Sequence, residues 1–156
     1  MTATVTHTQS DRVDPESGTL PAGWVNVHLS EVVSVLDNLP IPVNREEREN
    51  RLKSGTGKPL YQYYGATGPV GLIDDYIYDG EYVLLGEDAA PFLDRTKPKA
   101  YISRGKFWVN NHAHVLQAFP SIIDNRYILH ALNVFNYQHY VSGTTRLKLT
   151  QQSLNI

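Results

Sequence analysis

Short apolar stretches, most of them alternating with polar residues, recur along the chain from residue 20 onward. This spacing is typical of β-strands with one buried face, and unbroken apolar runs of similar length indicate strands buried on both faces. We predict strands over residues 24–29, 60–64, 72–73, 81–85, 100–103, 107–116 and 147–149. Asp79-Gly80 and Arg104-Gly105-Lys106 lie between predicted strands, and we predict a tight turn at each.

A helical period occurs in one segment, which begins after the capping residue Asp124. Its apolar stripe consists of Tyr127, Ile128, Ala131, Leu132 and Phe135. A shorter helix is predicted over residues 31–36, with Ser30 as its cap. Residues 44–58 are predicted to form a long exposed loop with a helical turn over residues 46–52, because Leu52 is their only large apolar residue. The predicted class is α+β: a curled, mainly antiparallel β-sheet with a few packed helices.

The composition indicates one globular domain. The chain has 156 residues, of which 41% are hydrophobic, and it contains no cysteine. Residues 1–19 are polar and aperiodic, so we expect a disordered leader there and a single domain over residues 20–156. We find neither a signal peptide nor an apolar run of membrane-spanning length, and we expect a cytoplasmic protein with no membrane partner.

The net charge of −2 conceals an uneven distribution. Six basic and fifteen acidic residues precede Arg95, whereas eight basic residues and one acid, Asp124, follow from that position onward. Such a chain can present a basic face to a polyanion. The two halves can equally neutralise each other in the fold, and composition leaves both alternatives open.

Motifs for catalysis are missing or incomplete. The segment Gly55-Thr56-Gly57-Lys58 lacks the first glycine of a phosphate-binding loop and has Pro59 where that loop needs Ser or Thr. No acid-x-lysine pair of a metal-dependent nuclease occurs, nor an Asn-Pro-Pro-aromatic motif for amino methylation. We therefore expect no enzyme activity, no cofactor and no metal.

Two histidines offer the main alternative. His112 and His114 share one face of a predicted strand and could ligate one metal with Asp74 as in a small nuclease, but histidines bonded in or beside a core are the more ordinary interpretation. A carbohydrate-binding module is a second alternative, because the chain holds ten tyrosines.

Four segments, in order and spacing, resemble the DNA specificity subunits of type I restriction-modification enzymes. They are Leu20-Pro21-Ala22-Gly23-Trp24 with the following Leu29-Ser30-Glu31-Val32; the stretches 63–76 (YYGATGPVGLIDDY) and 79–90 (DGEYVLLGEDAA); residues 105–116 (GKFWVNNHAHVL); and residues 143–149 (GTTRLKL). The resemblance covers residues 20–156. In that family the chain continues into a spacer helix, so we expect a half-subunit or a fragment with a single target-recognition domain.

The resemblance implies a function and partners. The chain would bind double-stranded DNA and recognise one half of a bipartite target, or serve as a regulatory or decoy half-subunit. Methyltransferase and motor-nuclease subunits would carry out the chemistry, in a prokaryotic cell and close to the nucleoid. The resembling segments themselves are expected to be structural, with Asn110, Asn111 and His112 satisfying buried backbone groups.

Residues that read DNA are expected on the irregular loops, where specificity can vary without changing the core. Lysines mostly contact phosphates, and arginines can also bond guanine edges. The candidates are Arg45, Arg48, Lys53 and Lys58 in the first loop, Tyr64 and Thr67 at a strand-to-turn junction, Lys97 and Lys99 in the second loop, and Arg104 in a turn.

Overall fold

A six-stranded sheet forms the centre of the computed structural model, which describes residues 2–5, 22–39, 41–55 and 57–154. The strand order is β3 (Val33–Val35), β8 (Ala113–Ala118), β6 (Tyr78–Gly86), β7 (Ala100–Val109), β4 (Tyr61–Gly65) and β5 (Gly68–Ile73). All neighbours are antiparallel except the parallel pair β4 and β7. The α+β class and the mainly antiparallel sheet are therefore confirmed. The predicted curl is not, since the sheet is open with β3 and β5 as its edges.

Strands β6 and β7 pair over most of their length, and this pairing corrects two predicted turns. Asp79-Gly80 lies inside β6 and Arg104-Gly105-Lys106 lies inside β7, where Gly80 faces Gly105. Gly105 has φ +73°, a conformation that distorts a strand without reversing it and that suits glycine. The predicted strand 107–116 is instead divided by a turn at residues 110–112 between β7 and β8.

Helix α2 (Asn125–Val134) confirms the predicted helix, and the Asp124 side chain accepts a hydrogen bond from the Arg126 amide at its start. Ile128 and Leu132 are buried against the sheet in the largest apolar cluster. The helix predicted over residues 31–36 is wrong: the 3₁₀ turn η1 (Leu29–Glu31) leads directly into β3. The β-branched Val33 and Val35 favour the extended form, and β8 supplies their hydrogen-bonding partner.

Smaller elements flank the sheet. β1 (Thr2–Val5) pairs in parallel with β2 (Trp24–Val27), so part of the predicted leader forms a strand, while the remainder of it lies outside the described residues. β9 (Val141–Ser142) and β10 (Lys148–Leu149) form a hairpin that is followed by α3 (Gln151–Leu154). Within the described ranges, no helix combines the length and the apolar character needed to span a membrane.

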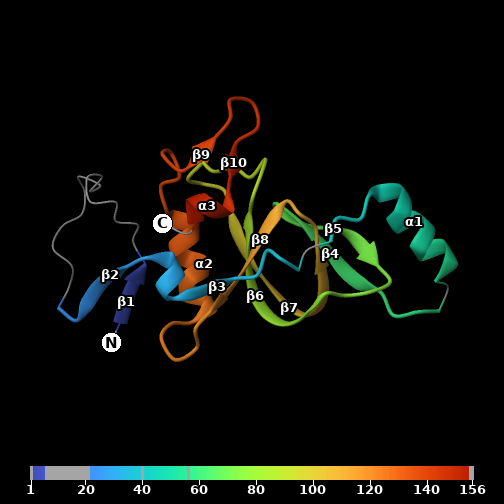
Figure 1. Ribbon diagram of the computed structural model, residues 1–156, viewed down its shortest axis with the longest axis horizontal. Helices are drawn as coiled ribbons and strands as arrows, with labels where there is room; N and C mark the ends of the chain where they lie inside the picture. The colour runs from blue at the N-terminus through green and yellow to red at the C-terminus, as the bar shows by residue number, and fades with distance from the viewer. Residues whose placement is uncertain (1, 6–21, 40, 56, 155–156) are drawn as a thin grey trace.

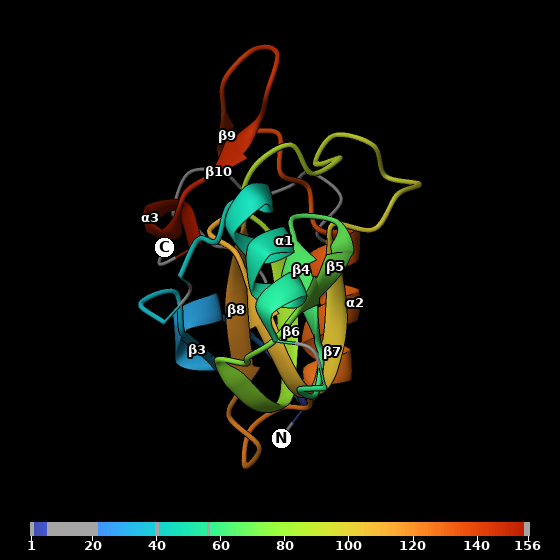
Figure 2. The same cartoon turned by 90° about the vertical axis from the view of Figure 1, so that its right-hand side faces the viewer.

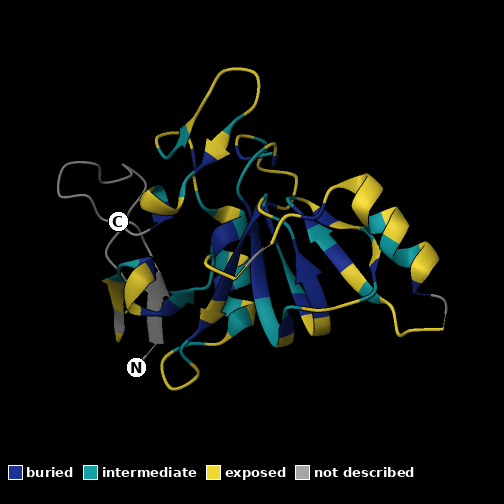
Figure 3. Cartoon of the chain, turned by 45° about the vertical axis from the view of Figure 1, so that its right-hand side comes forward, coloured by how far each residue is buried: buried dark blue, intermediate teal, exposed yellow. Residues whose placement is uncertain are grey.

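Helix α1 (Arg45–Ser54) projects from the end of the molecule where β4 and β5 lie (Figure 1). The sequence predicted only a helical turn in a loop here. A separate small core of Val43, Tyr63, Ile73 and Trp108 lies between this end of the sheet and the chain that enters α1. None of the residues of α1 is buried, and its outer surface is open to solvent (Figure 3).

Candidate nucleic-acid interface

Helix α1 is a polar helix held at both ends by hydrogen bonds. The Asn44 side chain accepts from the Glu47 amide at 2.8 Å, and the Gly55 amide donates to the Arg51 carbonyl at 2.9 Å. Between these ends the helix carries four basic and three acidic residues but only one large apolar residue, Leu52. A helix without an apolar face needs another kind of attachment to stay docked.

The attachment is aromatic. The Tyr63 hydroxyl donates to the Val43 carbonyl oxygen at 2.9 Å, and the Trp108 indole N–H donates to the Ile41 carbonyl oxygen at 2.8 Å. From the helix itself, the Arg48 guanidinium lies 4.7 Å from the centre of the Tyr63 ring. The Arg51 guanidinium lies 5.7 Å from the centre of the Trp108 ring. These contacts fix the segment before α1 and one face of α1, and they leave the opposite face free.

The structure brings the first four predicted residues to this end of the molecule, which faces the viewer in Figure 2. Arg45 and Lys53 are exposed on α1, and Arg45 pairs with Glu49 at 2.8 Å while its side chain remains 86% exposed. Lys58 follows the helix, with its ammonium 3.9 Å from Asp74. Arg48 belongs to the same group, but it is half-buried on Tyr63, so its first role is to hold the helix.

Tyr64 lies near the end of β4, and Thr67 lies in the turn between β4 and β5. Thr67 is exposed at its tip, whereas the half-buried Tyr64 ring packs 5.6 Å from each of the Tyr101 and Phe107 rings. The connection also lies against β6, because a Cβ added at Gly86 would meet the Ala66 carbonyl oxygen at 2.9 Å. Thr67 is therefore available to a ligand, while most of the Tyr64 ring is used in packing.

The remaining three predicted residues lie elsewhere, and one of them is corrected. Lys99 was expected in an exposed loop but is only 2% exposed, and its ammonium donates to the Asp94 carbonyl oxygen at 2.7 Å. A side chain enclosed in this way cannot contact DNA without leaving its partner. Lys97 is exposed and pairs with Asp94 at 3.4 Å, and Arg104 pairs with Glu81 at 2.7 Å across the β6–β7 pairing.

The uneven charge along the chain is largely balanced in the fold. Arg104, Arg146 and Lys148 from the basic half pair with acids of the other half, at distances of 2.7–3.0 Å. The alternative that the acidic and basic halves of the chain neutralise each other in the fold therefore holds for a large part of the basic residues from Arg95 onward. A surface lysine or arginine is therefore available to a phosphate only to the extent that no carboxylate already pairs with it.

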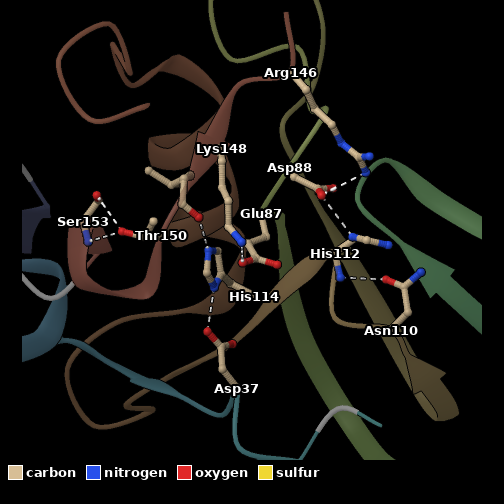
Figure 4. A network of polar contacts seen from close by, with 11 residues as sticks. Asp37, Glu87, Asp88, Asn110, His112, His114, Arg146, Lys148, Thr150 and Ser153 are labelled. Atoms are coloured by element: carbon tan, nitrogen blue, oxygen red, sulfur yellow. Dashed lines mark hydrogen bonds and ion pairs between the residues drawn. The ribbon is translucent and has the colours of Figure 1, made fainter. Parts of the chain in front are cut away.

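The two histidines considered as metal ligands are engaged in hydrogen bonds (Figure 4). His114 is buried, with Nδ1 2.6 Å from Asp37 and Nε2 2.8 Å from the Leu149 carbonyl oxygen. Burial by itself would lower the pKa of His114, but the hydrogen bond and charge of Asp37, helped by the Leu149 carbonyl, raise it overall. His112 bonds Asp88 at 3.1 Å, and among the described residues no cluster of three or more potential ligands could hold a metal.

The same network gives the resembling segments a structural role. The Asn110 side chain accepts from the His112 amide at 2.9 Å, and the His112 carbonyl accepts from the Glu87 amide at 2.8 Å. Asp88 accepts from Arg146 at 2.9 Å, which ties the β9–β10 hairpin to the sheet (Figure 4). The Asn110 side chain thus satisfies a backbone group as expected from the sequence. The His112 side chain instead bonds the Asp88 carboxylate.

Two cations of this region were missed by the sequence reasoning. Arg51 lies over Trp108, and Lys106 lies over Tyr76 at 4.5 Å. Lys106 and Trp108 are two residues apart on one strand and so share a face. This spacing could have indicated that Lys106 lies beside an aromatic residue. It was missed because the sequence prediction placed Lys106 in a turn and Trp108 in the strand that follows.

Comparison with known proteins gives concordant results. The family model of the type I restriction modification DNA specificity domain matches residues 21–155. A curated type I restriction enzyme specificity subunit of Haemophilus influenzae is 32% identical over 126 residues, which are 81% of this chain and 30% of that protein. The crystal structure of the S subunit of a type I restriction-modification system from M. genitalium superposes with a TM-score of 0.55 at 12% identity, over 83% of this chain and 32% of that one. The chain thus spans about a third of the length of these relatives.

Proposed function

Because the chain belongs to the type I restriction-modification DNA specificity family, we propose that it binds double-stranded DNA and recognises a short base sequence, one half of a bipartite target. It does so without catalysing a reaction. Cleavage and methylation belong to partner subunits, a methyltransferase and a motor-nuclease, with which it assembles on DNA in the cytoplasm.

The main structural support for a DNA-contacting surface is helix α1, which is exposed to solvent and yet firmly attached to the sheet. Its free side offers hydrogen-bond donors on Arg45 and Lys53 and both donor and acceptor groups on Asn50. An exposed helix with such groups can enter the major groove, where base pairs present distinct donor and acceptor patterns. Lys58, which follows α1, and Thr67, in the β4–β5 turn, are exposed and supply contacts to the backbone, where most protein–DNA hydrogen bonds form.

Two further predicted residues take a minor part in this proposal. Lys97 and Arg104 are exposed, and each can exchange its carboxylate for a phosphate of a long duplex. Tyr64 acts through the position of the β4–β5 connection rather than by touching DNA. Lys99 is left out because it is buried.

Binding titrations of the whole chain with duplex DNA test the proposal. If about four lysines and arginines meet phosphates, affinity should fall roughly a hundredfold between 50 and 200 mM salt. Arg45→Ala should weaken binding by about 1–3 kcal/mol if Arg45 bonds a base edge. Its melting temperature should stay nearly unchanged, because an exposed ion pair contributes little to stability.

Arg126→Ala is the matched control, since Arg126 is also an exposed arginine in the first turn of a helix and paired with an acid, but on α2. It should bind as the unmodified chain does. The assignment of α1 would be wrong if Arg45→Ala bound normally while Asn111→Ala or His112→Ala abolished binding in a folded protein. The resembling segments would then be the DNA-contacting ones.

A further inference from the structure

Three side-chain cations lie over aromatic rings in the described part of the chain, and all three rings belong to one region of the sheet. Arg48 lies over Tyr63 of β4, Arg51 over Trp108 of β7, and Lys106 of β7 over Tyr76, just beyond β5. None of these contacts involves the large core beneath α2.

The contacts are continuous along one face of β4 and β7. Tyr61 and Tyr63 are two residues apart on β4, as Lys106 and Trp108 are on β7, so each pair shares a face. Tyr63 and Trp108 are direct partners in the parallel register. Tyr76 closes the row, because its ring centre lies 5.1 Å from that of Tyr61. We call this row the aromatic–cation face; it consists of Arg48, Arg51, Tyr61, Tyr63, Tyr76, Lys106 and Trp108.

Two of its cations differ electrostatically from most others in the structure. Eight lysines and arginines of the described ranges have a carboxylate oxygen within 4.0 Å, and a phosphate would have to displace it. Arg48 and Lys106 are not among them. The hydrogen bond and charge of Tyr76 raise the pKa of the exposed Lys106.

The burial of the rings indicates what kind of ligand this face can take. Tyr63 is 2% exposed and Trp108 is 5% exposed, so neither ring can stack on an unpaired base. Tyr76, at 37%, is the most accessible ring of the row, and Lys106 lies over it. Binding of single strands relies on several open rings, whereas contact with a duplex backbone relies on cations and hydroxyls at the surface.

From this arrangement we propose that the aromatic–cation face is a contact site for the phosphates of a DNA duplex, with Lys106 as its principal cation and Arg48 as a second. The inference rests on the proposed function and adds a phosphate-binding residue to it. A cation already held over a ring loses less side-chain freedom on binding than a free lysine does. The face begins beneath α1, where Arg48 of α1 lies over Tyr63, so we expect one duplex to meet α1 and Lys106 together.

The test measures duplex affinity against salt concentration for Lys106→Gln. Loss of one phosphate contact should reduce the slope of log K against log salt by about 0.9 and weaken binding equally for different duplex sequences. Lys148→Gln is the control, because Lys148 is also an exposed strand lysine but is paired with Glu87 at 3.0 Å. It should leave the slope unchanged. Melting temperatures of both variants verify that they are folded.

The possible outcomes separate this inference from the proposed function. If the unmodified chain binds duplex DNA and Lys106→Gln binds with the same slope and affinity, the phosphate site is wrong and the proposed function stands. If Lys106→Gln changed the preference among duplex sequences, the phosphate assignment would also be wrong, because such a change indicates that Lys106 contacts a base. Tighter binding of single strands than of duplex would overturn the duplex assignment. If the unmodified chain binds no duplex even at 50 mM salt, both proposals fail.

Discussion

His114 shows how a single residue links the strands to the C-terminal hairpin. Its two ring nitrogens face the Asp37 carboxylate and the Leu149 carbonyl oxygen, both of which only accept hydrogen bonds. Both nitrogens must therefore donate, which requires the charged imidazolium. The charge is compatible with burial because Asp37 offsets it, and Asp37 also accepts from the Val115 amide at 3.0 Å.

This pair predicts a dependence of stability on pH. The pKa of folded His114 is raised above its ordinary value of 6.5, so its contribution is fully present below that pH and is lost as pH rises through the folded pKa. Asp37→Asn should lower the free energy of unfolding by about 1–3 kcal/mol below pH 6.5 and flatten the decline above it. Urea unfolding at several pH values measures both. Parallel profiles for the two proteins would show that Asp37 does not hold the charge.

For single residues, the sequence indicated which side chains are chemically important but not which groups they contact in the fold. It placed Asn110 correctly as a residue that satisfies a backbone group, but it did not indicate that His112 bonds Asp88. It failed for Lys99, because the groups that surround that lysine include Asn133 of α2, which accepts from the Lys99 amide at 2.7 Å from 34 positions away. Burial of a charged residue by a distant element leaves no local signal in the chain.

Helix α1 is the element on which the proposed interface depends, and its stability comes from contacts outside it. Isolated helices of this length are marginal in water, and α1 has no buried residue of its own. The small core with Tyr63 and Trp108 supplies the support. An element attached in this way can vary its outer residues without disturbing the sheet.

Replacement of Trp108 tests this support. Trp108→Ala should reduce the free energy of unfolding by roughly 3–5 kcal/mol, as expected for a buried aromatic residue. Trp108→Phe retains most of the ring but loses the hydrogen bond to Ile41, and it should cost about 1–2 kcal/mol. Chemical unfolding measures both, with the 78% exposed Val134→Ala as a control of small effect. A cost below about 1 kcal/mol for Trp108→Ala would remove the basis for a firmly held α1.

Element prediction succeeded where the signal was periodic and failed where pairing decided the outcome. The stripe after Asp124 predicted α2 correctly. Asp79-Gly80 and Arg104-Gly105-Lys106 are turn signals by composition, yet each glycine faces the other across two strands, and this pairing keeps both segments extended. Val33 and Val35 form a strand for the same reason, because they pair with β8.

Taken as a whole molecule, the chain has no surplus of positive charge with which to attract DNA. Its net charge is −2, and eight lysines and arginines of the described ranges already have a carboxylate partner. Non-specific attraction to DNA should therefore be weak, and affinity should depend on a few cations at the α1 end. The function itself could be inferred from the sequence only through the family segments, because no composition or catalytic motif indicates it.

Selection of bound duplexes from a random pool at 50 mM salt tests most directly the claim that this chain reads a DNA sequence. Repeated rounds should enrich one short common sequence, and Arg45→Ala should lose or alter this enrichment while Arg126→Ala retains it. A pool that is retained by the chain yet remains as random as the input would contradict sequence recognition. The chain would then bind the DNA backbone without recognising bases.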